Sequence, residues 1–303
     1  MSGITRLDVV TGFLGAGKTT LVARYAAWLK RRGISYCIIE NEFGRAGVDG
    51  ALLSADGADV REISGGCVCC TLKVTLHDLL RELNGKVDRI ILEPSGLFCG
   101  DDLLDILHSP DCGVAEGMWV CVLDPPAAAA MSEEDRAVLE SELFAAGSVV
   151  VSKAQYADAE ELDAARACIA ALSPLPAGWT APWDTLEDDA WFSAMQAAGT
   201  VERAHTRRRF DHAAMFQSAC LSPNGVYSEE ELRQVLERSV RPEVGAVSRI
   251  KGTVAAAQGC WRVNCTPGCI GYSPAAEETQ PVLNFIGRGL DRRLLRTLWR
   301  VGQ

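Results

Sequence analysis

One stretch near the start of the chain limits what it can fold into more than any other. Residues 12–19 read GFLGAGKT and match the pattern G-x-x-x-x-G-K-[ST]. An apolar run at residues 7–10 precedes this stretch, and a helical pattern begins at Leu21. A strand, a glycine-rich turn and a helix start are the surroundings in which this pattern binds phosphate groups. We therefore expect the chain to bind a nucleoside triphosphate at this loop.

The residues of the loop are expected to share the binding of the phosphates and of Mg²⁺. Glycines let backbone N–H groups curl around the β-phosphate, and the following helix adds the positive end of its dipole. Lys18 should reach the β- and γ-phosphates, and the Thr19 hydroxyl should hold Mg²⁺. The expected phosphate-binding residues are Gly12, Gly15, Ala16, Gly17, Lys18, Thr19 and Thr20.

Apolar runs alternate with helical patterns along the first half of the chain. Runs at 35–40, 87–92, 119–123 and 148–151 read as buried strands, and residues 20–32 and 71–83 read as helices. This alternation predicts a parallel sheet with helices on both faces. The predicted fold class is α/β, a P-loop NTPase domain with a parallel sheet followed by a smaller α+β domain.

Two residues after one of these strands are expected to complete the phosphate site. Glu93 directly follows the buried run at 90–92, and in an open α/β sheet ligands bind at the carboxyl ends of strands. Glu93 should hold Mg²⁺ or its waters and polarise the attacking water. Gly96 should offer its N–H to the γ-phosphate, as a switch segment does. The alternative is that Glu93 only ends a strand.

The segment expected to contact the base departs from the usual pattern. Guanine is commonly read by N-K-x-D after a late strand, and residues 152–155 read SKAQ here. Ser152 takes the asparagine position, and Lys153 can still stack its alkyl stem on a base. Gln155 has one carbonyl acceptor and an NH₂ donor, so it cannot repeat the two bonds that a carboxylate accepts. Both GTP and ATP remain open from these residues.

Three of the 12 cysteines lie within four residues of one another. Cys67, Cys69 and Cys70 follow two glycines, and such a turn can direct several thiolates at a cation such as Zn²⁺. Zinc prefers four ligands, and Glu40 at the end of a predicted strand can supply an oxygen. The alternative is three buried thiols, since free cysteine is often buried.

A second group of cysteines lies near the C-terminus, and its spacing is less informative. Cys260, Cys265 and Cys269 have the spacing C-x₄-C-x₃-C. A second metal site is one interpretation. The other is that two of these side chains lie on opposite faces of one strand.

Charge and hydropathy exclude several classes of partner. The chain has 30 basic and 40 acidic residues and a net charge of −10, which argues against a nucleic-acid partner. No stretch approaches the ~18 uninterrupted apolar residues that read as a membrane span. With no export signal at the N-terminus, we expect a cytoplasmic protein whose cysteines are not a disulfide framework.

Length and composition suggest two domains among the 303 residues. We expect the P-loop domain at 1–178, an irregular linker at 179–209 and the α+β domain at 210–303. In the last, Ser228 should cap a helix that begins with three glutamates. Runs at 248–256 and 260–265 read as paired strands, and 291–300 reads as a closing helix.

The combined motifs GFLGAGKTT, IENEFG, GGCVCC and EPSGL resemble those of the CobW-type GTPases of the G3E group. The similarity is strong to about residue 172 and weaker beyond it, through RIKG at 249–252 and NFIGRGLD at 284–291. The resemblance implies a GTPase that uses GTP with Mg²⁺ and acts as a metallochaperone or metal-insertion factor for Zn²⁺ or Co²⁺. It implies a client metalloprotein as partner, with a homodimer left open. It also implies phosphate and Mg²⁺ binding by the loop residues, Glu93 and Gly96, and transition-metal binding by Cys67, Cys69, Cys70 and Glu40.

The chain departs from the family pattern at the SKAQ segment, at Arg45, where an acidic residue is common, and in having no histidine-rich tract. Two other functions remain open. A small-molecule kinase would transfer phosphate to a metabolite without metal dependence. A nucleotide-dependent interaction switch would keep a permanent metal or bind none.

Overall fold

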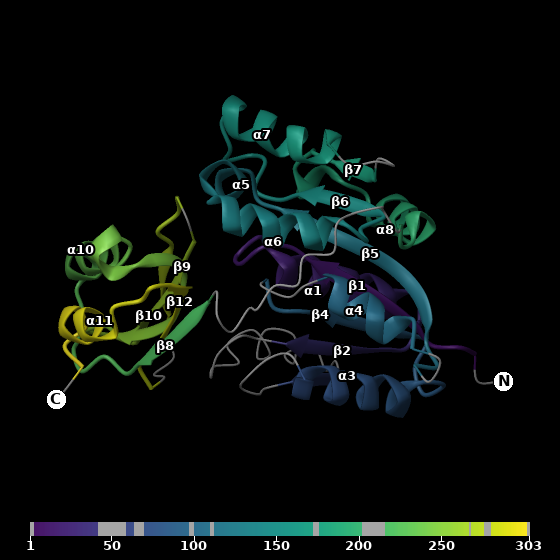
Figure 1. Ribbon diagram of the computed structural model, residues 1–303, viewed down its shortest axis with the longest axis horizontal. Helices are drawn as coiled ribbons and strands as arrows, with labels where there is room; N and C mark the ends of the chain where they lie inside the picture. The colour runs from purple at the N-terminus through teal and green to yellow at the C-terminus, as the bar shows by residue number, and fades with distance from the viewer. Residues whose placement is uncertain are drawn as a thin grey trace. The chain divides into compact units, whose positions relative to one another are not determined.

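The computed structural model describes residues 3–41, 59–63, 70–96, 100–109, 112–171, 176–201, 216–266, 268–275 and 280–301. These residues form two compact units, one containing the described residues up to 201 and the other those from 216 onward. Figure 1 shows the elements of both units. Each unit has its own hydrophobic core.

The larger unit is built on a seven-stranded sheet with the order β3-β2-β4-β1-β5-β6-β7, and all of its described strand pairs are parallel. This confirms the predicted α/β class. The elements are β1 (Arg6–Thr11), α1 (Lys18–Arg31), β2 (Tyr36–Asn41), β3 (Asp59–Ile63), α3 (Cys70–Leu83), β4 (Arg89–Glu93), α4 (Gly100–Leu107), β5 (Ala115–Leu123), α5 (Pro125–Ala130), α6 (Glu133–Leu143), β6 (Ser148–Val151), α7 (Ala159–Ala170), β7 (Ala177–Trp179), the 3₁₀ turn η1 (Trp183–Thr185) and α8 (Asp188–Ala198).

Helices cover both faces of this sheet, as Figure 1 shows. One face packs against α3, α4, α6 and α7, and the other packs against α1 and α8. Successive residues of a strand point to opposite faces, so Val9 belongs to the first core and Val10 to the second. Strands buried on both sides are apolar throughout, which is why the sequence shows continuous runs here instead of alternation.

Most of the described part of the expected linker is structured and belongs to the larger unit. The helix α8 places Trp191, Phe192 and Met195 in the core over α1, where their side chains are at most 2% exposed. The segment was predicted to be an irregular linker because acidic residues precede its apolar positions in the sequence. Asp188 instead forms an ion pair with Arg24 of α1, and Asp189 forms one with Arg32 directly after α1. Both acidic residues lie in the first turn of α8, where negative charge stabilises the helix dipole.

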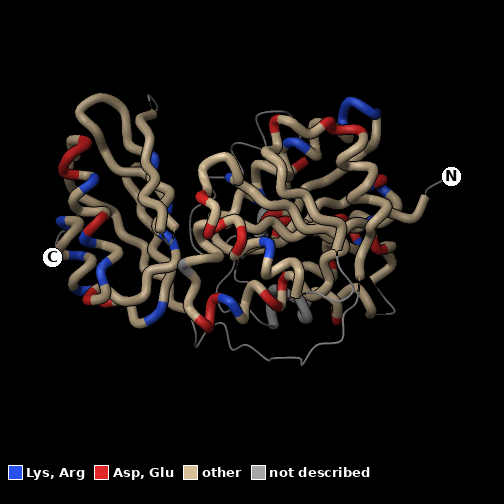
Figure 2. Tube along the Cα trace, turned by 90° about the horizontal axis from the view of Figure 1, so that it is seen from above, with Lys and Arg blue, Asp and Glu red and all other residues tan. Residues whose placement is uncertain are grey.

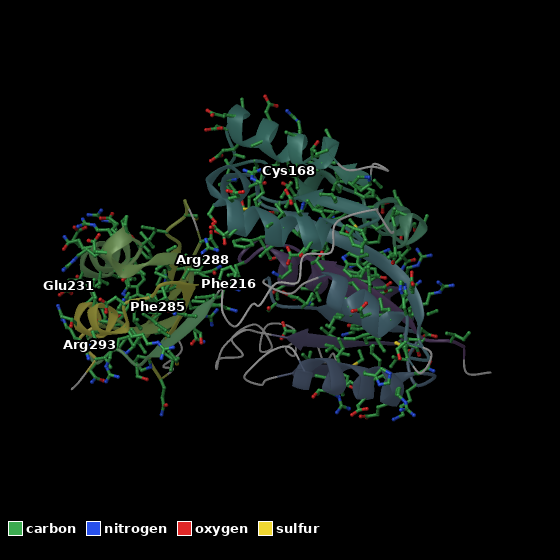
Figure 3. The ribbon with its side chains drawn as sticks, in the orientation of Figure 1. Cys168, Phe216, Glu231, Phe285, Arg288 and Arg293 are labelled. Atoms are coloured by element: carbon green, nitrogen blue, oxygen red, sulfur yellow. The ribbon has the colours of Figure 1, made fainter. Side chains whose placement is uncertain are left out.

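The smaller unit is a five-stranded sheet of order β11-β10-β9-β12-β8 with antiparallel pairs. Its elements are β8 (Gln217–Leu221), α10 (Glu229–Ser239), the 3₁₀ turn η2 (Pro242–Val244), β9 (Ala246–Ala255), β10 (Cys260–Cys265), β11 (Tyr272–Ala275), β12 (Val282–Arg288) and α11 (Arg292–Leu298). Phe285 of β12 is buried in its core, and the Arg288 guanidinium lies 5.1 Å from the ring centre of Phe216 (Figure 3).

Local signals in the smaller unit match the sequence well. Ser228 caps α10 by accepting from the N–H of Glu231, and the Glu231 side chain accepts from the N–H of Ser228. Acidic and basic residues are interspersed along α10, where Arg233 bridges two glutamates, whereas the charged residues of α11 are all arginines; Figure 2 shows charges of both signs in this unit. In the part of the chain described, no helix is both long and apolar enough to cross a membrane.

Candidate nucleotide-binding site

The loop between β1 and α1 has the backbone shape that its glycines permit. Gly12, Gly15 and Gly17 have φ values of 138°, 75° and 102°, in the region that side chains disfavour. A Cβ on Gly12 would lie 2.3 Å from the Val122 carbonyl oxygen of β5. Gly17 is the N-cap of α1, so the first amides of that helix open toward the loop. The predicted strand, turn and helix are all present.

Lys18 is held inside the curve of this loop. Its side chain is buried, and its Nζ donates hydrogen bonds to the carbonyl oxygens of Gly12 at 2.7 Å and Phe13 at 3.2 Å. These bonds fix the ammonium between the loop and the start of α1. A phosphate seated on the amides of the loop would meet this charge directly.

The side chains of Thr19 in α1 and Glu93 in β4, both expected to serve a Mg²⁺ site, contact each other. The Thr19 hydroxyl donates to Oε1 of Glu93 at 2.8 Å, and Glu93 ends β4, the neighbour of β1. Both groups offer oxygen atoms, the donors that Mg²⁺ prefers, beside the loop expected to hold the phosphates. This donor set fits Mg²⁺, which the Thr19 hydroxyl and the Glu93 carboxylate would hold if the ion were bound here.

Gly96 lies against the loop so closely that a side chain has no room. A Cβ on Gly96 would lie 2.5 Å from the Leu14 nitrogen and 2.7 Å from the Phe13 carbonyl carbon. The segment after β4 therefore packs its backbone directly on the loop. This contact suits a switch segment, because movement of the backbone after β4 would displace the backbone of the loop.

The expected base-contacting segment lies at the end of β6. Lys153 has a φ of 53°, and its Nζ donates to the Gly15 carbonyl oxygen at 3.1 Å and to Asp124. Ser152 is buried and donates its N–H to the Leu123 carbonyl oxygen at 2.8 Å, while Gln155 is exposed. Sequence reasoning missed Asp124 as the partner of Lys153. Its place at the end of the run 119–123 was the available signal.

Only part of the expected transition-metal site falls within the described residues. Cys67 and Cys69 lie outside them, and Cys70 is the first residue of α3, whose side chain there is not described. Glu40 is 8% exposed at the end of β2. It pairs in register with Glu93 of β4, so the two acidic residues lie side by side at the carboxyl ends of neighbouring strands. Glu40, expected to bind the transition metal, and Glu93, expected to serve Mg²⁺, are thus adjacent.

The second cysteine group, Cys260, Cys265 and Cys269, lies within the described residues. Among the described residues, no three His, Cys, Asp or Glu side chains gather as metal ligands. Cys265 lies in the core of the smaller unit, whereas Cys260, five positions earlier on β10, points to the other face. Two of these side chains thus face opposite sides of one strand, as the second interpretation expects, and the described residues give the metal interpretation no support.

Glu142 of α6 is a buried acidic residue next to the loop that sequence reasoning missed. Its side chain is fully buried, and neither carboxylate oxygen accepts a hydrogen bond of ordinary length and angle. Burial raises the pKa of this carboxyl from 4.5 to about 8, against the opposing effects of the Lys18 ammonium and the Gly12 amide. Its apolar neighbours on the helix gave no signal that this one glutamate points inward.

We expect Glu142→Gln to stabilise the protein, and to do so only above acidic pH. The carboxyl ionises near 4.5 when unfolded and near 8 when folded, so stability falls as the pH rises through this interval. The isosteric amide removes that loss. The gain at pH 8 should be a few kcal/mol, with an upper bound of about 5 kcal/mol from the pKa difference.

Denaturant unfolding at pH 5 and pH 8 measures this effect. The matched control is Glu140→Gln, an exposed position on the same helix, which should change stability little at either pH. Equal stability changes for Glu142→Gln at both pH values would contradict the account of an ionisable group held in a low-dielectric site.

Comparisons with known proteins agree with this geometry. Residues 7–176 match the family model described as CobW/HypB/UreG, nucleotide-binding domain. The chain is 37% identical over 156 residues to the zinc chaperone YeiR of Escherichia coli K12, covering 50% of this chain and 47% of that protein. It is 34% identical over 205 residues to the zinc chaperone CobW of Pseudomonas aeruginosa, covering 55% and 54%. The chain thus spans about half the length of these relatives.

A solved structure of Zn(II)-bound YjiA GTPase from E. coli aligns over 99% of this chain and 100% of its own, with 18% identity and a TM-score of 0.45. The family model covers more than half of the chain and includes the loop, Glu93 and the end of β6. The chain therefore belongs to the CobW/HypB/UreG family of nucleotide-binding proteins.

Proposed function

We propose that this protein is a metal-binding P-loop GTPase that acts as a metallochaperone or metal-insertion factor. It binds Zn²⁺, Co²⁺ or a related divalent ion at Cys67, Cys69, Cys70 and Glu40, and GTP with Mg²⁺ at the loop between β1 and α1. The observation that carries the proposal is the register pairing of Glu40 with Glu93. Glu40 is one of the proposed transition-metal ligands, and Glu93 beside it is proposed to face the γ-phosphate side of the nucleotide.

The chain's own residues account for nucleotide binding and hydrolysis in this proposal. The loop amides and Lys18 hold the phosphates and offset their charge, as in other P-loop proteins. Mg²⁺, when bound by Thr19, neutralises charge on the β- and γ-phosphates. Glu93 orients the attacking water, and the Gly96 N–H donates to the γ-phosphate. Loss of that phosphate removes one contact between the segment after β4 and the nucleotide site, which changes the balance between the positions that this segment can adopt.

The same movement can change the affinity for the transition metal. Neighbouring parallel strands lie ~4.8 Å apart, so a shift at Glu93 acts directly on Glu40. Three thiolates and one carboxylate suit Zn²⁺ and Co²⁺, and a site with one exchangeable ligand can release its ion. A state with GTP bound would hold the ion, and hydrolysis would release it to a client metalloprotein. We place this activity in the cytoplasm, where thiols stay reduced.

The names of the relatives support zinc as the first ion to test, since YeiR and CobW are both described as zinc chaperones. GTP is favoured over ATP by the family similarity. The kinase alternative has no observation in its favour among the described residues. The interaction-switch alternative makes a different prediction about metal exchange.

We expect a non-hydrolysable GTP analogue with Mg²⁺ to tighten Zn²⁺ or Co²⁺ binding by about 5- to 150-fold, the usual range of coupling between sites. A competitive metal titration with and without the analogue measures this, and a parallel series with an ATP analogue tests the base. The double variant Cys69→Ser, Cys70→Ser should lose both the affinity and the coupling.

The control is Cys37→Ser in the core strand β2, which removes a thiol that burial keeps protonated, its pKa being raised to about 11. The folded Cys37→Ser protein should bind metal with the same affinity as the original protein. If metal binds equally with either analogue or with none, there is no coupling, and the interaction switch replaces the metallochaperone.

A further inference from the structure

Trp183 lies beside the phosphate-binding loop although nothing in the sequence pattern assigns it there. A Cβ on Gly17 would lie 3.7 Å from Cη2 of the Trp183 ring and 3.8 Å from the Ser152 Cβ. The indole is half-buried, so part of the ring lies against the core and part remains accessible. An aromatic ring and the start of the expected base-contacting segment thus meet at the same glycine.

The position of this ring is set from three sides. Its Nε1 donates to the Val151 carbonyl oxygen at 2.9 Å, at the last residue of β6. Its own carbonyl oxygen accepts from the Arg24 guanidinium at 2.6 Å. The ring also packs against Trp191 of α8, with centres 5.8 Å apart at 55°. A ring held in this way loses little conformational entropy when a ligand binds against it.

Lys153 is fixed at the same end of the loop. Its hydrogen bonds to Gly15 and Asp124 extend the alkyl stem along the loop and leave the side chain 36% exposed. Both side chains follow late strands of the sheet, β6 and β7, at their carboxyl ends, where ligands bind in an open α/β sheet. A nucleotide whose phosphates sit on the loop would extend its base into this region.

We propose that Trp183 contacts the base of the bound nucleotide and supplies an apolar, aromatic surface for it together with the alkyl stem of Lys153. This inference rests on the proposed nucleotide binding. It also explains how the base could be held although Gln155 of the SKAQ segment cannot accept two hydrogen bonds from guanine. Stacking is tolerant of the base because every base has a π-face. Base binding here therefore depends more on ring contact than on reading the exocyclic groups.

Replacing Trp183 tests the proposal when binding of nucleotides is compared with binding of inorganic triphosphate. Trp183→Ala should weaken GDP binding about 10-fold, within the range that alanine substitution of stacking aromatics produces. ADP should lose affinity by a similar factor. Trp183→Phe should retain most of the affinity, because a phenyl ring can still stack. Inorganic triphosphate, which has no base, should bind all three proteins with the same affinity within about twofold, because its contacts are those of the loop alone.

The matched control is Trp179→Phe, a neighbouring tryptophan of β7 that packs against the same core. It should leave GDP, ADP and triphosphate binding unchanged. Two results would overturn the proposal. One is GDP affinity of Trp183→Ala within twofold of the original protein. The other is an equal loss for triphosphate, which would mean that the ring only supports the loop. Absence of nucleotide binding by the original protein would overturn the proposed function as well.

Discussion

Replacing Lys18 by alanine is expected to lower nucleotide hydrolysis by at least about 100-fold, the cost of removing one charge-stabilising donor in an enzyme site. The side chain is buried inside the loop and bonded to the carbonyl oxygens of Gly12 and Phe13, so its ammonium lies where the phosphates are expected. Without the ammonium, the negative charge that gathers on the phosphates is met only by backbone amides and Mg²⁺.

Steady-state phosphate release and calorimetric binding of GTP and ATP measure this loss. Lys30→Ala provides the control, since this exposed lysine lies in the last turn of the same helix. It should hydrolyse nucleotide at the original rate. Hydrolysis by Lys18→Ala within tenfold of the original rate would mean that the chemistry occurs elsewhere than at this loop.

Gly96→Ala is expected to have the second large effect, through sterics alone. The new Cβ would lie within 2.5–2.9 Å of three backbone atoms of the loop, at Gly12, Phe13 and Leu14. Backbone cannot rotate away as a flexible side chain can, so the loop or the segment after β4 must move. We expect a loss of about 1–3 kcal/mol of stability, as for other overpacked sites. Nucleotide affinity should fall at least about tenfold, or 1.4 kcal/mol.

The control for this prediction is Gly178→Ala in β7 of the same unit. A Cβ there meets nothing within 4 Å, so neither stability nor affinity should fall. Thermal unfolding and nucleotide titration of both variants measure stability and affinity when a methyl group is added at a crowded site, Gly96, and at an open site, Gly178. A Gly96→Ala protein that binds nucleotide normally would show that the loop and the switch segment are not in functional contact.

The sequence predicted the sheet and the loop because their signals are local. Residues 12–19 and the apolar runs before and after them need no knowledge of distant contacts. The structure confirms β1, β2, β4, β5 and β6 close to the expected positions. Glu93 was identified for the same reason, since the end of a buried strand can be read from the chain alone.

What the sequence did not reveal depends on contacts between distant segments. The sequence did not predict α8, because its acidic first turn resembles a solvated linker. Those acidic residues form ion pairs with Arg24 and Arg32, and these contacts are seen only in the structure. Glu142 and Trp183 lie beside the loop although they are far from it in the sequence, as their contacts with Gly12 and Gly17 show. Helix periodicity predicts neither contact. The sequence likewise left two interpretations open for Cys260, Cys265 and Cys269, and the strand β10 shows that Cys260 and Cys265 face opposite sides.

The central claim is that nucleotide and transition metal bind to coupled sites, and reciprocity tests it most directly. If the GTP analogue tightens Zn²⁺ binding by some factor, then Zn²⁺ must tighten binding of the analogue by that same factor. Calorimetric titration of the analogue into metal-free and Zn²⁺-loaded protein, with Mg²⁺ present throughout, measures the second factor. The account predicts a factor of at least about 5, equal to that from the metal titration and absent in Cys69→Ser, Cys70→Ser. Equal nucleotide affinity with and without Zn²⁺ would contradict it.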